Sequence, residues 1–270
     1  MPIVEGRLRA ALYLPASNAR ALAKARTLPV SLVILDLEDS VPAIDKTSAR
    51  DAAVAAVGPD FPNAIIRVNA ADSSHHDADV TAVAGSAAPA VVVPKVDDAA
   101  TAARVAAALG KPIFAMIETP KGVFAAREIA AAEGVIGLIA GGNDLAKELR
   151  LPPAGNRPGL HLSLQMIVLA ARAAGVLALD GVFNGLEDAA GLEAECLEGK
   201  AHGFDGKTLI HPNQVETANR VFGPTAEEVE DAEALVAAAR DGAERFRGRM
   251  IENMHVATAR DILAEAARFV

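Results

Sequence analysis

The chain has 270 residues, a length that fits one large α/β domain. Hydrophobic residues make up 51% of the chain and aromatic residues only 3%, so the core must be aliphatic and rich in alanine. The formal net charge of −9 argues against a nucleic-acid-binding protein, which is usually basic. No signal-like region or apolar stretch of roughly 20 residues is present, so we expect a cytoplasmic protein that binds neither nucleic acid nor membrane.

The single cysteine, Cys196, excludes a disulfide framework and a zinc site built from cysteines. Its neighbours, Leu192 to Leu197, form an amphipathic helical pattern. We therefore expect a buried structural thiol and not a nucleophile.

Eight short aliphatic runs alternate with longer alanine-rich helical patterns. Each run is almost continuously apolar, as is typical of parallel strands covered on both faces. The expected strands are Arg9–Leu14, Ser31–Leu37, Ala64–Val68, Ala90–Val93, Ile113–Ile117, Val135–Ala140, Val176–Val182 and Thr208–Ile210. The expected helices are Asn18–Thr27, Lys46–Val57, Asp79–Gly85, Asp98–Leu109, Gly122–Ala132, Leu145–Leu149, Gly159–Ala174, Leu186–Glu198 and Pro212–Val221.

Eight such units predict a (β/α)8 TIM barrel of the α/β class. The alternative, a doubly wound open sheet, would need a Gly-x-Gly-x-x-Gly turn after its first strand, which this sequence lacks.

We predict that the barrel spans residues 1–222 and that residues 223–270 form a C-terminal helical extension. A long helix is expected over Thr225–Phe246, because Pro224 and Thr225 mark its start and acidic residues follow in its first turn. A short irregular stretch and a final helix over His255–Phe269 follow. The extension is long enough to cap the barrel or to act as a lid on a neighbouring subunit.

The carboxyl ends of the expected strands are unusually polar. In a TIM barrel these ends meet at one face, where catalytic groups lie. The polar strand ends include Asp36–Asp39, Arg67–Asn69, Pro94–Lys95, Glu118–Pro120, Gly141–Asp144, Asp180, Asn184 and His211–Asn213. A ring of carboxylates would repel itself unless a cation lay among them.

The type of these side chains indicates which cation they would hold. Oxygen ligands without cysteine and with few histidines favour Mg²⁺, or Mn²⁺, over zinc. Glu118 and Asp144 follow adjacent strands, so their carboxylates can reach one ion. The alternative is that strand-end charges cap helices or pair with one another, which applies to Asp39 and to Lys95.

These same residues carry a resemblance to a known family. The sequence is similar to the citrate lyase β-subunit-like (CitE-like) branch of the HpcH/HpaI aldolase/citrate lyase family over essentially its whole length. The similar stretches are Leu14–Pro15, Asn18–Arg20, Val33–Val41, Ile66–Asn69, Val93–Val96, Met116–Gly122, Gly141–Leu145, Phe204–Thr208 and Ile210–Gln214.

The resemblance implies a Mg²⁺-dependent carbon–carbon lyase that works as a homotrimer. Such enzymes cleave 3-hydroxyacyl thioesters of the citryl, malyl, citramalyl or hydroxymethylglutaryl type, carried on CoA or on an acyl-carrier protein, into an acetyl thioester and a 2-oxo acid. The family's metal ligands fall on Glu118 and Asp144. Its substrate-binding arginine falls on Arg67, and its acid after strand two falls on Glu38.

Two stretches depart from the family pattern. The first loop reads Pro-Gly-x-Arg-Pro in many relatives, whereas here residues 15–20 read Pro-Ala-Ser-Asn-Ala-Arg. A C-terminal Met-Ile-Asp motif of related lyases, which supplies an aspartate to a neighbouring subunit, is Met250-Ile251-Glu252 in this chain. The carboxylate of Glu252 is therefore retained but stands one methylene further from the backbone.

The implied reaction is a retro-Claisen cleavage. We expect Arg67 to stabilise negative charge on the thioester oxygen or the carboxylate, and Glu252 of a neighbouring subunit to protonate the enolate carbon. Backbone amides around Gly141, Gly142 and Asn143 would hold the substrate carboxylate.

Two alternatives to a thioester lyase remain open. A class II aldolase acting on free 2-oxo acids would use a histidine early in the barrel, and the first histidine in this chain is His75. A non-catalytic protein that binds a metal ion and a 2-oxo acid is the second alternative, and the altered first loop is the feature that keeps it open.

Overall fold

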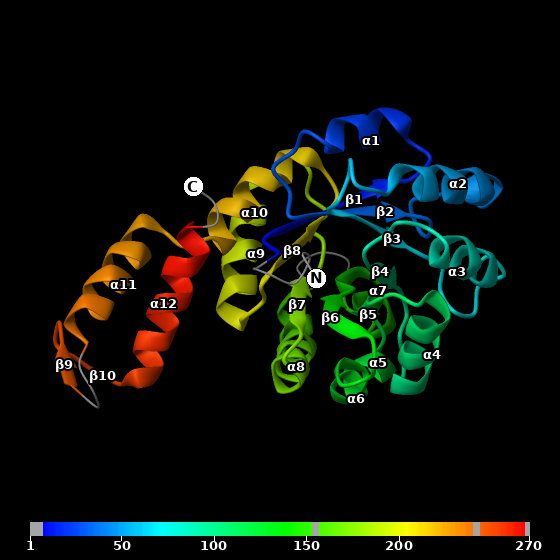
Figure 1. Cartoon of the computed structure of the whole chain (residues 1–270). Helices are drawn as coiled ribbons and strands as arrows, with labels where there is room; N and C mark the ends of the chain where they lie inside the picture. The colour runs from blue at the N-terminus through cyan, green and yellow to red at the C-terminus, as the bar shows by residue number, and fades with distance from the viewer. Residues whose placement is uncertain (1–7, 153–156, 240–243, 268–270) are drawn as a thin grey trace.

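The computed structural model, which describes residues 8–152, 157–239 and 244–267, is built around a closed barrel of eight parallel strands (Figure 1). The strands follow one another around the ring in chain order, and the first pairs with the last to close it. They are β1 (Ala10–Pro15), β2 (Leu32–Asp36), β3 (Ala64–Arg67), β4 (Val91–Val93), β5 (Ile113–Ile117), β6 (Val135–Ala140), β7 (Leu177–Asp180) and β8 (Gly206–Leu209). The predicted barrel is confirmed, and the open sheet is excluded.

Helices cover the outside of the barrel. They are α1 (Ala19–Ala25), the short helix η1 (Ala43–Asp45), α2 (Lys46–Ala56), α3 (His76–Ala84), α4 (Ala99–Leu109), α5 (Pro120–Phe124), α6 (Ala126–Ala130), α7 (Gly142–Glu148), α8 (Arg157–Ala174), α9 (Ala189–His202), the short helix η2 (Pro212–Gln214) and α10 (Val215–Phe222). Cys196 of α9 is fully buried, and burial raises the pKa of its thiol to about 11, as expected for a structural cysteine. Within the described residues, the model holds no helix with the length and apolar character to cross a membrane.

Alternation along the strands explains why the polar residues face the barrel axis. Side chains two residues apart on a strand share a face, and one buried cluster of inward residues fills the barrel interior. On β2 this inward series runs from Ile34 to Asp36, and on β3 from Ile65 to Arg67. Each series therefore begins with aliphatic residues and ends in a polar side chain at the carboxyl mouth.

A glycine on β6 makes room for the largest fully buried side chain of the barrel interior. Phe114 of β5 is fully buried beside Gly137, its partner in the strand register. A Cβ atom on Gly137 would lie 2.6 Å from the Phe114 ring, a distance that real side chains do not tolerate. The glycine in this strand is therefore a packing requirement of the barrel.

Beyond α10 the chain forms a separate element that we call the C-terminal arm (residues 224–267). It consists of α11 (Ala226–Ala238), a hairpin of β9 (Glu244–Phe246) and β10 (Arg249–Ile251), and α12 (Asn253–Ala267). The expected single helix over Thr225–Phe246 is therefore wrong after Ala238. Arg247 and Gly248 have φ angles of 46° and 84°, and such a pair of positive values forms the two-residue turn that joins antiparallel strands.

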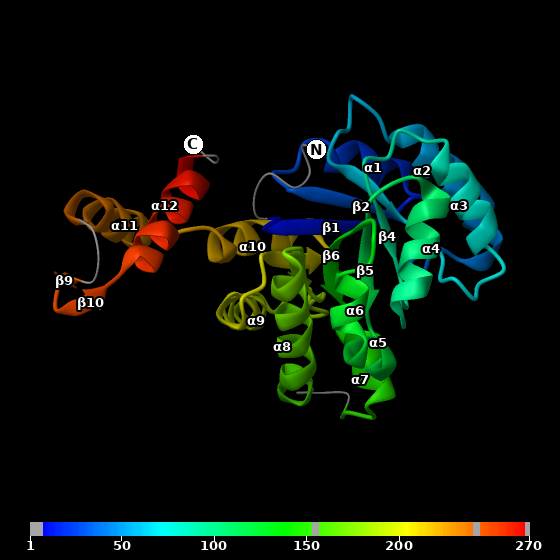
Figure 2. The same ribbon diagram turned by 60° about the horizontal axis from the view of Figure 1, so that its bottom comes forward.

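The C-terminal arm packs around a small hydrophobic cluster of its own, which includes Leu235, Ile251 and Val256. Figures 1 and 2 show it standing beside the barrel and not across the carboxyl mouth. Near the end of α12, Glu265 accepts a hydrogen bond of 3.0 Å from Arg9 at the start of β1. The arm is thus tied to the opposite end of the barrel from the polar mouth.

Candidate active site

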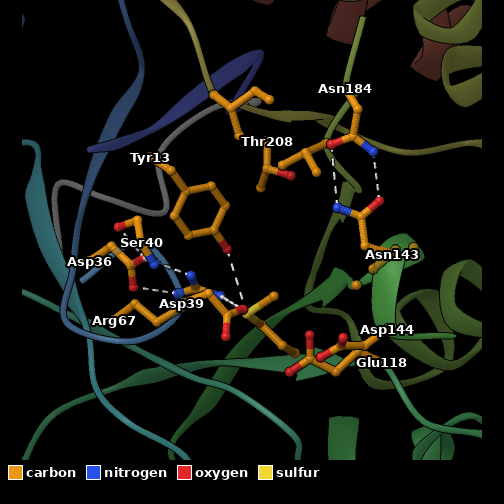
Figure 3. A pocket seen from close by; sticks show the side chains of 16 residues that line it. Tyr13, Asp36, Asp39, Ser40, Arg67, Glu118, Asn143, Asp144, Asn184 and Thr208 are labelled. Atoms are coloured by element: carbon orange, nitrogen blue, oxygen red, sulfur yellow. Dashed lines mark hydrogen bonds and ion pairs between the residues drawn. The ribbon is translucent and has the colours of Figure 1, made fainter. Parts of the chain in front are cut away.

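The polar strand ends surround one cavity of about 290 Å³ at the carboxyl mouth of the barrel (Figure 3). Its lining brings together the residues expected to bind metal and substrate, namely Arg67, Glu118, Gly141, Gly142, Asn143 and Asp144. The lining also includes Tyr13, Asp36, Asp39, Ser40, Met116, Asn184 and Thr208. Glu38 and Glu252 are not among the residues that line it.

Arg67 is held rigidly by Asp36, its direct neighbour in the strand register. The Arg67 Nε and Nη2 atoms each donate a hydrogen bond of 2.7 Å to one oxygen of Asp36. Asp36 in turn accepts hydrogen bonds from the backbone amide and the hydroxyl of Ser40. Burial opposes ionisation of Asp36, but these bonds, led by those from Arg67, hold its pKa below the usual value. Asp36 is therefore the ionised anchor of Arg67.

Glu38 lies behind Arg67. Its Oε2 atom is 2.9 Å from Arg67 Nη1, and its Oε1 atom is 3.5 Å from the ammonium of Lys95. Burial raises the pKa of Glu38 to about 7, against the opposing effect of Arg67. Of its two basic neighbours, Arg67 lines the cavity and Lys95 does not. A direct catalytic role for Glu38 stays a prediction.

Glu118 extends the inward series of β5 and is 4% exposed. Its Oε1 atom accepts a hydrogen bond of 2.7 Å from the backbone amide of Lys95, a residue in the left-handed region with φ 51°. A Cβ atom on Gly141 would lie 2.5 Å from Glu118 Oε2. Gly141 thus leaves the space that Glu118 occupies, while its own amide donates to the carbonyl oxygen of Ile117.

Asp144 lies in the first turn of α7 and is more exposed than Glu118. The Lys95 ammonium lies between acids, 3.6 Å from Asp144 and 3.5 Å from Glu38. Burial, followed by repulsion from Glu38, raises the pKa of Glu118 to about 7, and the charge of Asp144 acts in the same direction. The alternative considered for Lys95, that it pairs with strand-end acids, is correct.

The donor set at Glu118 and Asp144 fits a hard divalent cation. Both residues offer carboxylate oxygens to the same cavity, and they raise each other's electrostatic energy when no cation lies between them. The described residues contain no group of three or more histidine, cysteine, aspartate or glutamate side chains arranged for a metal ion. Two carboxylates with an open side are what Mg²⁺ uses when water and substrate oxygens complete its shell.

Asn143 and Asn184 form a reciprocal amide pair on the wall opposite Tyr13 (Figure 3). Asn184 Nδ2 donates to Asn143 Oδ1 at 2.7 Å, and Asn143 Nδ2 donates to Asn184 Oδ1 at 3.3 Å. This pair connects the first turn of α7 with the loop that follows β7. Substrate binding by Gly141, Gly142 and Asn143 stays a prediction. The amides of Gly142 and Asn143 lie in the first turn of α7, whereas the Gly141 amide already donates to the carbonyl oxygen of Ile117.

Glu252 begins the last segment of the C-terminal arm, directly after β10. Its side chain is exposed, and its backbone amide donates to the ring of His255 at 2.9 Å. The arm stands beside the barrel (Figure 2), and Glu252 is not among the residues that line the cavity of its own chain. A role for it in catalysis therefore requires a second subunit.

Two residues of this cavity, Asp36 and Tyr13, had no role predicted from the sequence. Asp36 was placed beside Glu38 without a role, although its position opposite Arg67 follows from the register of β2 and β3. Tyr13 was not considered at all. The signal for Tyr13 is its chemistry, since it is the one tyrosine of the chain and interrupts an otherwise aliphatic strand.

Known proteins are similar to this chain in sequence and structure over nearly its whole length. A (3S)-malyl-CoA thioesterase of Cereibacter sphaeroides is 43% identical over 96% of this chain and 94% of its own length. A citrate lyase subunit beta-like protein of Mycobacterium tuberculosis is 33% identical, with 94% of both chains covered. The structure is similar to that of CitE from M. tuberculosis in complex with magnesium, acetoacetate and coenzyme A, with a TM-score of 0.87, 32% identity and coverage of 98% and 99%.

A family model also matches the chain. It describes the HpcH/HpaI aldolase/citrate lyase family and covers residues 9–212, which include every strand of the barrel and every described residue of the cavity. The sequence resemblance is thereby confirmed, and the chain belongs to the HpcH/HpaI aldolase/citrate lyase family.

Proposed function

We propose that this protein is a Mg²⁺-dependent lyase that cleaves a carbon–carbon bond of a 3-hydroxyacyl thioester. The observation that carries the proposal is the arrangement of two carboxylates, Glu118 and Asp144, in one cavity with the anchored guanidinium of Arg67. In such a substrate, the carboxylate and hydroxyl at one end would bind a metal ion held by Glu118 and Asp144. The thioester at the other end would contact Arg67. Its products are an acetyl thioester and a 2-oxo acid.

Mg²⁺ would be held by Glu118 and Asp144, where it supplies Lewis-acid activation of the substrate hydroxyl and of the carbonyl that forms from it. The fit rests on the oxygen donors and on the pKa of Glu118, which burial and the charges of Glu38 and Asp144 raise to about 7 against the opposing effect of Arg67. Support also comes from M. tuberculosis CitE, which was solved with magnesium, and with magnesium together with oxaloacetate.

The residues of this chain would divide the remaining work. The amides of Gly142 and Asn143 hold the substrate carboxylate beside Asp144. Arg67, fixed by Asp36, faces the thioester and stabilises the charge that develops on its oxygen as the bond breaks. Because Asp36 has already fixed the guanidinium, little reorganisation is needed during the reaction.

The proton that ends on the enolate carbon requires a further acid. We assign it to Glu252 of a neighbouring subunit, because the Glu252 side chain is exposed on the C-terminal arm and lies outside its own cavity. This assignment requires an oligomer, and we propose the homotrimer implied by the sequence resemblance. The C-terminal arm would then act as a lid on the neighbouring barrel.

Hydrolysis of the thioester is the second candidate reaction. The 43% identity to (3S)-malyl-CoA thioesterases over nearly the full length favours it. The two reactions begin from the same bound thioester and differ in the bond that breaks: C–C in the lyase, C–S in the thioesterase.

Product analysis separates these candidates. The protein is incubated with (3S)-malyl-CoA and Mg²⁺, and products are identified by liquid chromatography and mass spectrometry. The lyase gives acetyl-CoA and glyoxylate in equal amounts, whereas the thioesterase gives malate and free CoA. A parallel reaction with a free 4-hydroxy-2-oxo acid tests the aldolase alternative. Cleavage of that acid without turnover of malyl-CoA or citramalyl-CoA would refute the proposed function.

A further inference from the structure

Two strong hydrogen-bond donors converge on one weak acceptor inside the cavity. The Tyr13 hydroxyl lies 3.5 Å from the sulfur of Met116, and Arg67 Nη1 lies 3.8 Å from the same sulfur (Figure 3). Tyr13 comes from β1, Arg67 from β3 and Met116 from β5, so three strands bring these atoms together. All three side chains line the cavity.

A thioether sulfur satisfies the Tyr13 hydroxyl poorly, whereas Arg67 Nη1 also lies 2.9 Å from Glu38 Oε2 and 3.6 Å from Asp39 Oδ2. Sulfur in methionine is a weak acceptor, and a donor held in a buried site without a good acceptor raises the free energy of the fold. Within the described residues, the Tyr13 hydroxyl has Met116 as its one hydrogen-bond partner. The other two nitrogens of Arg67 are occupied by Asp36, which leaves Nη1, shared with Glu38, to face the cavity.

The two donors are also held in place relative to each other. The Arg67 guanidinium carbon lies 4.8 Å from the centre of the Tyr13 ring, within the range of a cation–π contact. Burial raises the pKa of the Tyr13 hydroxyl well above its usual value, so it keeps its proton at neutral pH. Tyr13 is therefore a preorganised neutral donor beside a preorganised cationic donor.

We propose that the Tyr13 hydroxyl and Arg67 Nη1 together bind the thioester carbonyl oxygen of the substrate, with Tyr13 as a catalytic residue. The inference rests on the proposed function and names the second donor of its oxyanion site. In this view the Met116 sulfur lies where the donors point when no thioester oxygen is bound. The substrate oxygen replaces it as the shared acceptor.

The site suits the electron flow of the cleavage reaction. When the bond between C2 and C3 of the acyl chain breaks, the proton of the 3-hydroxyl leaves to a base and C3 becomes the carbonyl carbon of the 2-oxo acid. The electron pair of the broken bond moves through C2 onto the thioester oxygen, which becomes an enolate oxygen. Protonation at C2 returns the pair and gives the acetyl thioester. Negative charge thus appears transiently on the atom that Tyr13 and Arg67 contact.

Thioester hydrolysis would place charge on the same atom. Addition of a water oxygen to the carbonyl carbon, with loss of one proton to a base, moves the π pair onto the carbonyl oxygen. Return of that pair expels the thiolate, which takes up a proton. The Tyr13–Arg67 site therefore serves whichever of the two reactions the protein performs.

The test compares Tyr13→Phe with Met166→Leu, a change on α8 outside the cavity. Tyr13→Phe removes the hydroxyl but keeps the ring under Arg67, and we expect kcat to fall about 10²- to 10³-fold, the usual effect of losing one oxyanion donor, with KM raised by no more than about tenfold. Met166→Leu keeps the side-chain volume where Met166 packs on the outer core, and we expect kcat within about threefold of wild type. A kcat for Tyr13→Phe within threefold of wild type would overturn the proposal, as would equal losses in both variants.

A binding measurement separates the hydroxyl's action on the thioester from a purely structural role. Isothermal titration compares acetyl-CoA with S-ethyl-CoA, which lacks the carbonyl oxygen. We expect wild type to bind acetyl-CoA more tightly, and Tyr13→Phe to lose about tenfold of that preference, the effect of one net hydrogen bond, while its affinity for S-ethyl-CoA is unchanged. Parallel loss of affinity for both ligands would show a structural role and contradict the assignment.

Different results would refute the proposed function and the role of Tyr13. If wild type neither binds nor turns over any CoA thioester, the proposed function fails and the oxyanion site fails with it. If wild type turns over malyl-CoA while Tyr13→Phe keeps wild-type kcat and ligand preference, the proposed function stands and the role of Tyr13 is refuted.

Discussion

Asp36 holds the guanidinium of Arg67 through two hydrogen bonds of 2.7 Å, one to each carboxylate oxygen. The two residues are register partners on neighbouring strands, and both are almost fully buried. A bidentate pair of this kind fixes the plane of the guanidinium as well as its position. The orientation of Arg67 toward the cavity is thus a property of the barrel itself.

Replacing Asp36 by asparagine leaves the buried Arg67 without its main counter-charge. We expect the free energy of unfolding at pH 7 to fall by about 3 kcal/mol, the usual effect of removing one partner of a buried pair. Urea unfolding followed by circular dichroism measures this change. Ser48→Ala is a matched control, because Ser48 is exposed and bonds only to a backbone oxygen. A loss below 1 kcal/mol would show that the pair is not a main support of the site.

The same pair predicts how this difference depends on pH. The pKa of Asp36 in the folded protein lies below that of an unfolded chain, about 3.9. The pair therefore stabilises the fold fully above that value, and its contribution is lost as the pH falls through the lowered pKa. We expect the stability gap between wild type and Asp36→Asn to shrink below about pH 4. A gap that stays constant down to pH 2.5 would contradict an ionised Asp36.

Gly141→Ala tests whether the space beside Glu118 governs metal binding. The added Cβ atom would lie 2.5 Å from Glu118 Oε2, so the carboxylate must move. We expect the affinity for Mg²⁺ to fall about 10- to 100-fold, as happens when the support of a metal ligand is disturbed. Gly142→Ala is the control, because its Cβ atom would meet Leu160 at an ordinary 3.6 Å. Isothermal titration with Mg²⁺ compares the two, and equal affinities would refute the prediction.

Subunit complementation tests the role of Glu252. We expect Glu118→Gln and Glu252→Gln to be inactive separately, because each removes one half of a shared site. When the two variants are mixed under conditions that exchange subunits, about one quarter of the sites in a cyclic oligomer regain both intact residues. Recovery of roughly that fraction of wild-type turnover supports a site shared between subunits. Full activity of Glu252→Gln alone would exclude it.

The barrel could be predicted because its strands carry one dominant signal. Strands buried on both faces are continuously apolar, and each of the eight predicted apolar segments overlaps one strand of the barrel. Glu118 and Asp144 were assigned correctly to neighbouring strand ends, since strand order in a barrel follows chain order. The residues of the cavity could thus be predicted from the sequence where their position depends only on the order of the strands.

Features that depend on side-chain geometry could not be predicted in the same way. No motif marks the pairing of Asp36 with Arg67, since it arises from a register that only the folded barrel defines. The convergence of Tyr13 and Arg67 on Met116 involves three strands far apart in the chain. In the C-terminal arm, helical propensity suggested one long helix, but the left-handed backbone at Gly248 favours the hairpin instead.

The most direct test of the central proposal is the Mg²⁺ dependence of malyl-CoA turnover in Glu118→Ala and Asp144→Ala. Glu128→Ala serves as the control, because Glu128 is an exposed carboxylate of α6 that pairs with Arg127 and does not line the cavity. We expect wild type and the control to turn over substrate with Mg²⁺ and to lose activity in a chelator, while both ligand variants stay folded and inactive. Turnover at the wild-type rate in either ligand variant, with chelator present, would contradict a magnesium site at Glu118 and Asp144.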